Sequence, residues 1–179
     1  MKDARTALLA SDLTGAALRT ALVELYDGWL AGLFGEQRPG VALVAVGGLG
    51  RREVAPGSDL DLVLVHDGSH DVQALADALW YPVWDTGVGL DHAVRTVEEA
   101  LAVAADDLKA ALGLLDARHL AGDAALSTDL LSRTRAAWRA GAARRLPKLR
   151  EAVLGRAHLE GEVAFLLEPD LKSARGGLR

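Results

Sequence analysis

A glycine-rich segment with a neighbouring arginine is the first part of the sequence that could do chemistry. Gly47, Gly48 and Gly50 directly follow an apolar run. Residues without side chains let backbone N–H groups approach an anion closely. Arg51 adds a mobile positive charge beside them. The segment therefore has the composition of a phosphate-binding loop.

Two aspartates follow, at the entrance of a second apolar run. Asp59 and Asp61 flank Leu60, and the two-residue period of a strand would place both carboxylates on one face. Carboxylates held a few ångströms apart repel each other unless a divalent cation lies between them. Because Mg²⁺ binds one or two carboxylates together with phosphate oxygens, the pattern predicts a magnesium and phosphate site.

Other phosphate loops fit the segment less well. A dinucleotide-binding loop requires G-x-G-x-x-G, but the sixth position counted from Gly48 is Glu53. A P-loop requires Gly-Lys-Ser/Thr, and this segment contains no lysine. A glycine turn followed by two surface aspartates remains the alternative interpretation. The glycine segment and the aspartate pair occur together between two apolar runs, with Ser58 directly before Asp59. This combined pattern is more specific than the glycines or the aspartates alone.

Short apolar runs and helical periodicities predict the elements that must position these residues. We expect strands over Val41–Val46, Leu60–His66 and Gly87–Thr96. Thr96 and Glu99 form a capping box that opens a helix. Helices are expected over 4–34 with a break near Gly15, 71–84 with a bend or end at Pro82, 96–105, 106–120, and 127–159 with a break at Pro147.

This order of elements predicts an α+β fold with a small sheet and a helical extension. We expect one domain over residues 1–125, which includes the N-terminal helix 4–34. Residues 126–179 would form the helical extension and a tail.

Composition excludes several classes of protein. The chain has 179 residues, half of them hydrophobic and a quarter charged, which excludes intrinsic disorder. It has no cysteine, which excludes disulfide scaffolds and thiolate sites. The net charge of −5 argues against nucleic acid as a partner. With no signal-peptide pattern and no apolar run long enough for a bilayer, we expect a soluble, cytoplasmic protein without a membrane partner.

One stretch departs from the acidic average. Residues 133–158 carry eight arginines and lysines against one acid, Glu151. A solvated helix face explains such a stretch. The functional alternative is an electropositive surface for a phosphate-bearing ligand or an acidic protein.

Four ordered blocks extend from residue 47 to the end of the chain: GGLGR with SDLD (47–51 and 58–61), WD with GLDHAVRT (84–85 and 89–96), LDARHLAGD (115–123), and LEPDLK with GGLR (167–172 and 176–179). Together they resemble the N-terminal catalytic domain of the PII-protein uridylyltransferase/uridylyl-removing enzymes, within the DNA polymerase β superfamily of nucleotidyltransferases. The resemblance implies a polymerase β-like nucleotidyltransferase fold with a small mixed sheet.

The resemblance also implies an activity and its residues. A nucleoside monophosphate would pass from UTP or ATP to a tyrosine hydroxyl of a PII signal-transduction protein. Asp59 and Asp61 would hold two Mg²⁺ ions together with a third acid, for which Asp91 is the first candidate and Asp85 the alternative. The remaining site residues would cradle the triphosphate (Gly47, Gly48, Gly50) or support the loop and the phosphates (Arg51, Ser58).

Two further activities of that family, nucleotide removal and glutamine sensing, belong to a metal-dependent hydrolase domain and ACT domains that follow along the chain. Nothing in this sequence resembles those domains, so we expect the tail to lead into downstream domains that are missing here. Two alternatives stay open. One is another polymerase β-type enzyme, such as a small-molecule or antitoxin-like adenylyltransferase. The other is a nucleotide-binding fragment without turnover.

Overall fold

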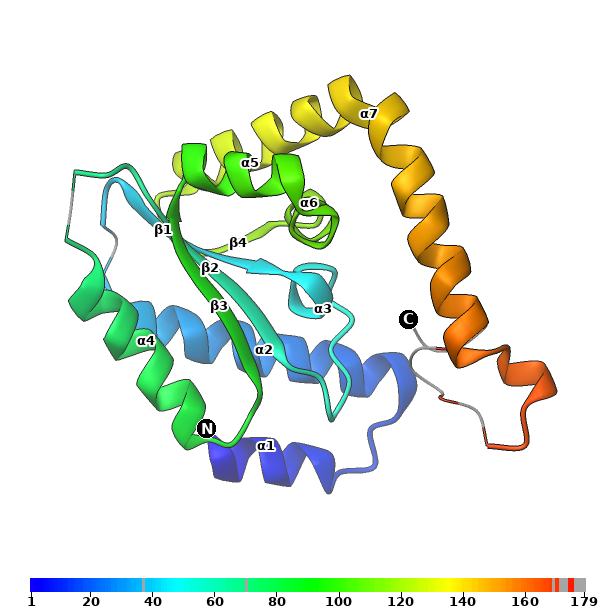
Figure 1. Cartoon of the computed structure of the whole chain (residues 1–179). Helices are drawn as coiled ribbons and strands as arrows, with labels where there is room; N and C mark the ends of the chain where they lie inside the picture. Colours follow the sequence, from blue (N-terminus) through cyan, green and yellow to red (C-terminus); the bar gives the residue numbers. More distant parts are fainter. Residues whose placement is uncertain (37, 70, 169, 171–173, 176–179) are drawn as a thin grey trace. The chain divides into compact units, whose positions relative to one another are not determined.

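A computed structural model of the chain describes residues 1–36, 38–69, 71–168, 170 and 174–175 (Figure 1). The chain divides into two compact units, residues 1–137 and 138–179. The division falls inside the helix α7 (Ala124–Glu160). The domain boundary expected at residue 125 stays a prediction.

The first unit is built on a mixed four-stranded sheet. Its strands are β1 (Val41–Val46), β2 (Leu60–His66), β3 (Leu90–Thr96) and β4 (Arg118–Gly122), in the order β3-β2-β1-β4. β1 is antiparallel to both β2 and β4, whereas β2 and β3 are parallel. The expected α+β fold with a small mixed sheet and a helical C-terminal part is therefore confirmed.

Successive side chains along each strand point to opposite faces of the sheet, and the apolar set determines which face becomes the core. Two helices, α2 (Gly15–Phe34) and α4 (Gln73–Asp85), cover one face of the sheet (Figure 1). Every second strand residue packs against them in one buried cluster. The cluster includes Leu22, Tyr26, Leu30, Phe34, Val41, Leu43, Ala45, Leu60, Leu62, Leu64, Leu75, Leu79 and Val83. The intervening strand residues, Asp61 among them, face the other way.

The opposite face carries the short helix α3 (Gly47–Gly50), α5 (Val97–Asp106) and α6 (Leu108–Leu115) (Figure 1). The predicted capping box at the start of α5 is confirmed. The Glu99 N–H donates to the Thr96 hydroxyl at 3.2 Å, and the Glu99 carboxylate accepts from the Thr96 N–H at 2.8 Å. This cap fixes the direction in which the chain leaves β3.

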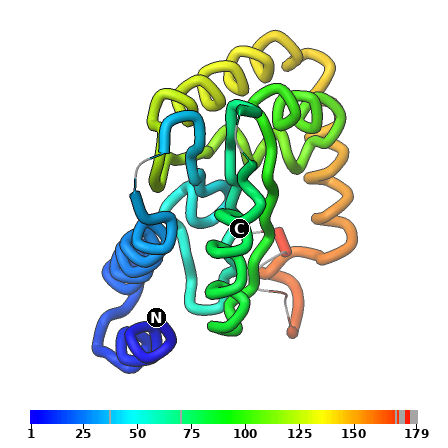
Figure 2. Tube along the Cα trace, turned by 90° about the vertical axis from the view of Figure 1, so that its left-hand side faces the viewer, coloured from blue at the N-terminus to red at the C-terminus, as the bar shows by residue number. Residues whose placement is uncertain are grey.

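The N-terminal helical region is broken near Gly15, as expected. α1 (Lys2–Leu9) ends at Leu9, and Gly15 begins α2 with a φ of 55°. α1 runs along the outside of α2, as Figure 2 also shows, and Leu8 and Leu9 pack against the core. The N-terminal helices therefore lie on the core side of the sheet.

The helix expected over 106–120 is wrong in its second half. α6 ends at Leu115, and residues 118–122 form β4, which pairs with β1 with a register shift beside Leu43. Gly122 sits against β1 with a φ of 86°, a conformation that glycine adopts without strain. Pairing with a buried neighbouring strand overrides the helical periodicity of this segment.

The helix break expected at Pro147 is also wrong, because α7 continues through it to Glu160. Pro147 is exposed, so water can bond the backbone carbonyl that the proline leaves without a helical donor. Pro82 likewise lies inside α4, which ends three residues later at Asp85. Each helix therefore tolerates the one backbone hydrogen bond that its proline cannot donate.

The second unit contains the rest of α7 and a short 3₁₀ helix, η1 (Val163–Phe165). Arg145 is buried and stacks over the Trp138 ring, with its guanidinium carbon 5.6 Å from the ring centroid. Arg175 pairs with Glu162 at 2.8 Å. The resemblance block LEPDLK with GGLR falls mostly outside the described residues.

Within the described part of the chain, none of the helices combines the length and the apolar character needed to cross a membrane.

We predict that the capping box makes stability depend on pH. Hydrogen bonds from Thr96 lower the pKa of Glu99 below its ordinary 4.5, so its stabilisation is present above that value and disappears as pH falls through the lowered pKa. Glu99→Ala should therefore lower the melting temperature at pH 7 and match the wild type at strongly acidic pH. Thermal melts followed by circular dichroism across pH 2 to 7 measure this. Glu99→Gln is the matched control, because its side-chain oxygen can still accept the hydrogen bond from the Thr96 N–H. If Glu99→Ala lowered the melting temperature equally at every pH, the prediction would be contradicted.

Candidate functional site

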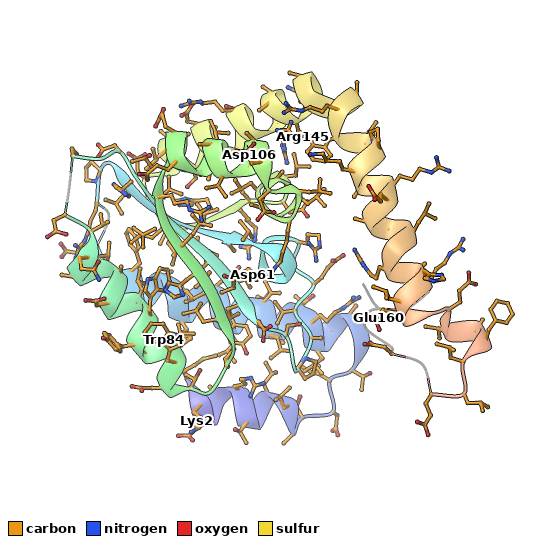
Figure 3. All side chains as sticks on the ribbon, in the orientation of Figure 1. Lys2, Asp61, Trp84, Asp106, Arg145 and Glu160 are labelled. Atoms are coloured by element: carbon orange, nitrogen blue, oxygen red, sulfur yellow. The ribbon has the colours of Figure 1, made fainter. Side chains whose placement is uncertain are left out.

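Asp61 is the centre of the carboxylate group. It is the second residue of β2, half-buried, and lies at the end of the sheet beside α3 (Figure 3). It opposes Val46 of β1 on one side and Asp91 of β3 on the other. Because paired residues of neighbouring strands point to the same face, the structure brings Asp61 and Asp91 together.

Two glycines make room for the carboxylates. The side chain of Asp59 occupies the space that a Cβ at Gly89 would fill, and the side chain of Asp61 occupies that space at Gly47. The Leu60 N–H donates to the Gly89 carbonyl at 2.8 Å, which extends the contact between the two chain segments to Gly89 on the β3 side. Asp59, Asp61 and Asp91 thus approach one another on the face opposite the core.

The electrostatics of Asp61 reflect this crowding. Burial and the negative charges of Asp91 and Asp59 raise the pKa of the Asp61 carboxyl. Lys109 and a backbone hydrogen bond from Gly48 act in the opposite direction without cancelling the rise. An ionised Asp61 therefore costs stability, and any added positive charge at this position would relieve that cost.

Lys109 is the cation that faces this group. It lies in the first turn of α6, and its Nζ is 3.9 Å from Oδ2 of Asp91. Both side chains are open to solvent, at 90% and 70% exposure. Lys109 can therefore change partners without disturbing the core.

The glycine loop that begins next to Asp61 is held from outside. Arg118 of β4 donates to the Leu49 carbonyl at 2.9 Å and forms two 2.8 Å hydrogen bonds with the Asp27 carboxylate of α2. A Cβ on Gly50 would lie 2.6 Å from the Asp116 carbonyl oxygen and 3.0 Å from that of Ala45. The backbone of the loop is thus fixed between α2, β1 and β4.

Arg51 and Ser58 brace their segments. The Arg51 guanidinium donates to Glu53 at 2.8 Å and to Asp116 at 3.3 Å, and the hydrogen bond to Glu53 is the main reason its pKa is raised. The Ser58 hydroxyl accepts from the Ala55 N–H at 3.0 Å and closes the turn before Asp59. Both residues therefore hold the polypeptide that carries the site.

The carboxylate oxygens of this group are the kind of ligand that a hard divalent cation binds, but they do not surround a single position. No group of three or more carboxylate, imidazole or thiol side chains is close enough to hold a metal ion among the described residues. Asp61, whose pKa is raised, and the neighbouring carboxylates of Asp59 and Asp91 nevertheless offer the oxygen ligands that Mg²⁺ takes. The alternative third acid, Asp85, is the exposed last residue of α4, whereas Asp91 acts directly on Asp61.

Sequence reasoning missed three residues of this region: Gly89, Lys109 and Arg118. Gly89 and Arg118 lie in resemblance blocks, but their contacts come from strand pairing and from the unpredicted β4. Lys109 had no signal in the sequence, because its partner lies eighteen positions earlier on another element.

No model of a known protein family matches the chain. It is 60% identical over 171 residues to the bifunctional uridylyltransferase/uridylyl-removing enzyme of Streptomyces coelicolor, covering 93% of this chain and 20% of that protein. The enzyme of that name from Mycobacterium tuberculosis is 47% identical over 174 residues, with 94% and 22% covered. The chain thus spans about a fifth of the length of the curated relatives it matches, in their N-terminal region.

Among solved structures, the crystal structure of a toxin–antitoxin with AMP-PNP is similar over 70% of this chain and 97% of that one. The identity is 12% and the TM-score 0.45.

We predict that a methyl group at position 89 disrupts the carboxylate group while leaving the fold intact. Gly89→Ala places its Cβ against the Asp59 carboxylate, so Mn²⁺ affinity measured by calorimetry should fall at least about tenfold. Gly57→Ala is the matched control, because a Cβ there meets nothing within 4 Å. Unchanged Mn²⁺ binding by Gly89→Ala would show that Asp59 is not a ligand.

We also predict that Asp61→Asn stabilises the metal-free protein at pH 7. Because the fold raises the pKa of the Asp61 carboxyl, the protonated form of Asp61 favours the folded state. This contribution to stability is present at low pH and is lost as pH rises through the raised pKa. The neutral amide avoids this loss, so the variant should melt at a higher temperature than wild type in EDTA. Added Mg²⁺ should raise the melting temperature of the wild type and leave the variant nearly unchanged. A lower melting temperature for the variant in EDTA would contradict the electrostatic account.

Proposed function

Because the chain is homologous to the N-terminal region of the bifunctional uridylyltransferase/uridylyl-removing enzymes, we propose that it transfers a nucleoside monophosphate from a nucleoside triphosphate to a protein hydroxyl group. The acceptor in this proposal is a tyrosine of a PII-type signal-transduction protein. The nucleotide is UTP, as the name of the relatives suggests, with ATP as the alternative. The observation that carries the proposal is the pairing of Asp61 with Asp91 beside Gly47.

The three carboxylates have the role of metal ligands. Asp59, Asp61 and Asp91 would hold Mg²⁺ between them, which fits the raised pKa of Asp61. When bound, Mg²⁺ offsets negative charge on the phosphates and makes a nearby hydroxyl more acidic. Asp91, the member of the group on the edge strand β3, is available to accept the hydroxyl proton.

The glycine loop has the role of binding the triphosphate. Gly47 and Gly48 add no side chains of their own beside Asp61, whose carboxylate lies over Gly47 and accepts a backbone hydrogen bond from Gly48. Arg118 and Asp27 hold the loop from behind, so little rearrangement is needed when an anion arrives. Fixed donors aimed at a charged group are worth more than mobile ones, because no reorganisation is required during the reaction.

The reaction needs positioning and charge stabilisation. The acceptor oxygen forms a bond to the α-phosphorus while the bond between that phosphorus and the bridging oxygen of pyrophosphate breaks. Pyrophosphate leaves with the electron pair, and the hydroxyl proton passes to the carboxylate group. No covalent enzyme intermediate is required, in keeping with a site made of carboxylates and glycines.

We predict that a PII-type protein from Streptomyces coelicolor, the source of one of the relatives, gains one nucleotidyl group when incubated with this chain, Mg²⁺ and UTP. Intact-protein mass spectrometry identifies the group, and a parallel reaction with ATP decides between the two nucleotides. Asp59→Asn and Asp61→Asn should each lower the rate by about a hundredfold or more. Loss of activity in Asp91→Asn but not in Asp85→Asn would identify the third acid.

Each other outcome has a defined meaning. Full activity in Asp61→Asn would contradict the metal-ligand role. Modification with GMP or CMP would show that both proposed nucleotides are wrong. Triphosphate binding by calorimetry without any change in partner mass would indicate a nucleotide-binding module without turnover.

A further inference from the structure

Lys109 occupies an unusual position relative to the proposed site, because it is a cation placed against metal-ligand candidates. Its Nζ lies 3.9 Å from Asp91 Oδ2, and its charge also acts on Asp61. The lysine side chain is 90% exposed and comes from α6, outside the sheet that carries the carboxylates. Its ammonium group is therefore free to move while its backbone stays fixed.

The arginines around the site have other partners. Arg51 is bound by Glu53 and Asp116, and Arg118 is bound by Asp27 and the Leu49 carbonyl. Arg52 lies 3.9 Å from Asp27. Arg95, four residues after Asp91 on β3, acts on Glu99. Lys109 is the cation that the described residues place against the carboxylates themselves.

We propose that Lys109 neutralises the carboxylate group while no divalent cation is bound and then, once one binds, transfers to the triphosphate. This proposal rests on the proposed function, because it requires that the same site takes a metal ion and a nucleoside triphosphate. A divalent cation between the carboxylates repels the ammonium group at this separation. The triphosphate then becomes the nearest uncompensated anion, and a flexible lysine suits phosphate as a mobile point charge.

The exchange has a thermodynamic consequence. In the free protein the metal ion must displace Lys109, so the lysine weakens metal binding. In the ternary complex Lys109 gains a phosphate partner, so it strengthens triphosphate binding. Lys109 therefore couples the two ligands, and each should bind more tightly in the presence of the other by the same factor. A lysine that only forms a surface ion pair with Asp91 would not have opposite effects on the two ligands.

The test is calorimetry on Lys109→Gln with two ligands: Mn²⁺ alone, and the non-hydrolysable α,β-methylene analogue of UTP in the presence of Mg²⁺. Mn²⁺ affinity should rise about twofold to fivefold, the range expected for removing an exposed ion pair. Analogue affinity should fall about tenfold, as expected for losing a charge-assisted contact. Lys109→Arg keeps the charge and should restore both affinities to near wild type.

The matched control is Lys2→Gln. It removes the same side chain from α1, which runs outside α2 on the other side of the sheet and well away from Asp61 (Figure 3). Both affinities should stay at the wild-type values in this variant. Because Lys109 is exposed, its substitution should leave the circular dichroism spectrum and melting temperature close to wild type.

Two results would overturn the proposal. Mn²⁺ affinity that stays the same or falls in Lys109→Gln would show that the lysine does not compete with the metal ion. Unchanged analogue affinity would show that it does not reach the triphosphate. Wild-type protein that binds neither ligand would instead refute the proposed function, so the two failures are distinguishable.

Discussion

Repulsion between carboxylates on neighbouring strands is the constraint around which this end of the molecule is arranged. Asp61 cannot move away from Asp91, because the β2–β3 register places them opposite each other. Burial and, after it, the negative charge of Asp91 raise the pKa of Asp61, so an ionised Asp61 costs stability in this arrangement. Gly47 and Gly89 supply the space that the carboxylates need, and Lys109 supplies partial neutralisation. A fold without a function for this charge would gain stability by removing it.

The glycine loop depends on a second, opposite-charge interaction. Arg118 and Asp27 form a bidentate pair that is largely shielded from solvent, with side-chain exposures of 21% and 23%. The same guanidinium holds the Leu49 carbonyl, so α2 and β4 fix the loop together. This explains why β4 matters for the site although it carries no proposed ligand. A short, glycine-rich helix has little rigidity of its own and takes its shape from these neighbours.

The parts of the structure that follow from local sequence could be predicted. Val41–Val46 and Leu60–His66 form strands with the expected bounds, because a continuous apolar run and a period-two alternation leave few alternatives. The Thr96 capping box is equally local. β4 could not be predicted in this way, because residues 118–122 become a strand only by pairing with buried β1. The break predicted at Pro147 is absent because the proline is exposed, so water can bond the carbonyl that lacks a helical donor. The exposure of a helix position depends on the fold and not on the local sequence.

The candidate site also contains one part that local sequence predicts and one part that depends on the topology of the sheet. The antiparallel turn from β1 to β2 returns the chain so that Gly47 lies beside Asp61, a contact within one local unit that sequence spacing predicts. Asp91 arrives by a different route. The chain leaves β2 at the far end of the sheet, crosses back through α4 and enters β3 parallel to β2. Two parallel strands begin at the same edge, so the start of β3 must bring its acid to the start of β2. Asp85, still on the crossover helix, is left at the surface. Strand direction therefore determines that Asp91 and not Asp85 lies beside Asp61, and no local pattern of residues contains that information.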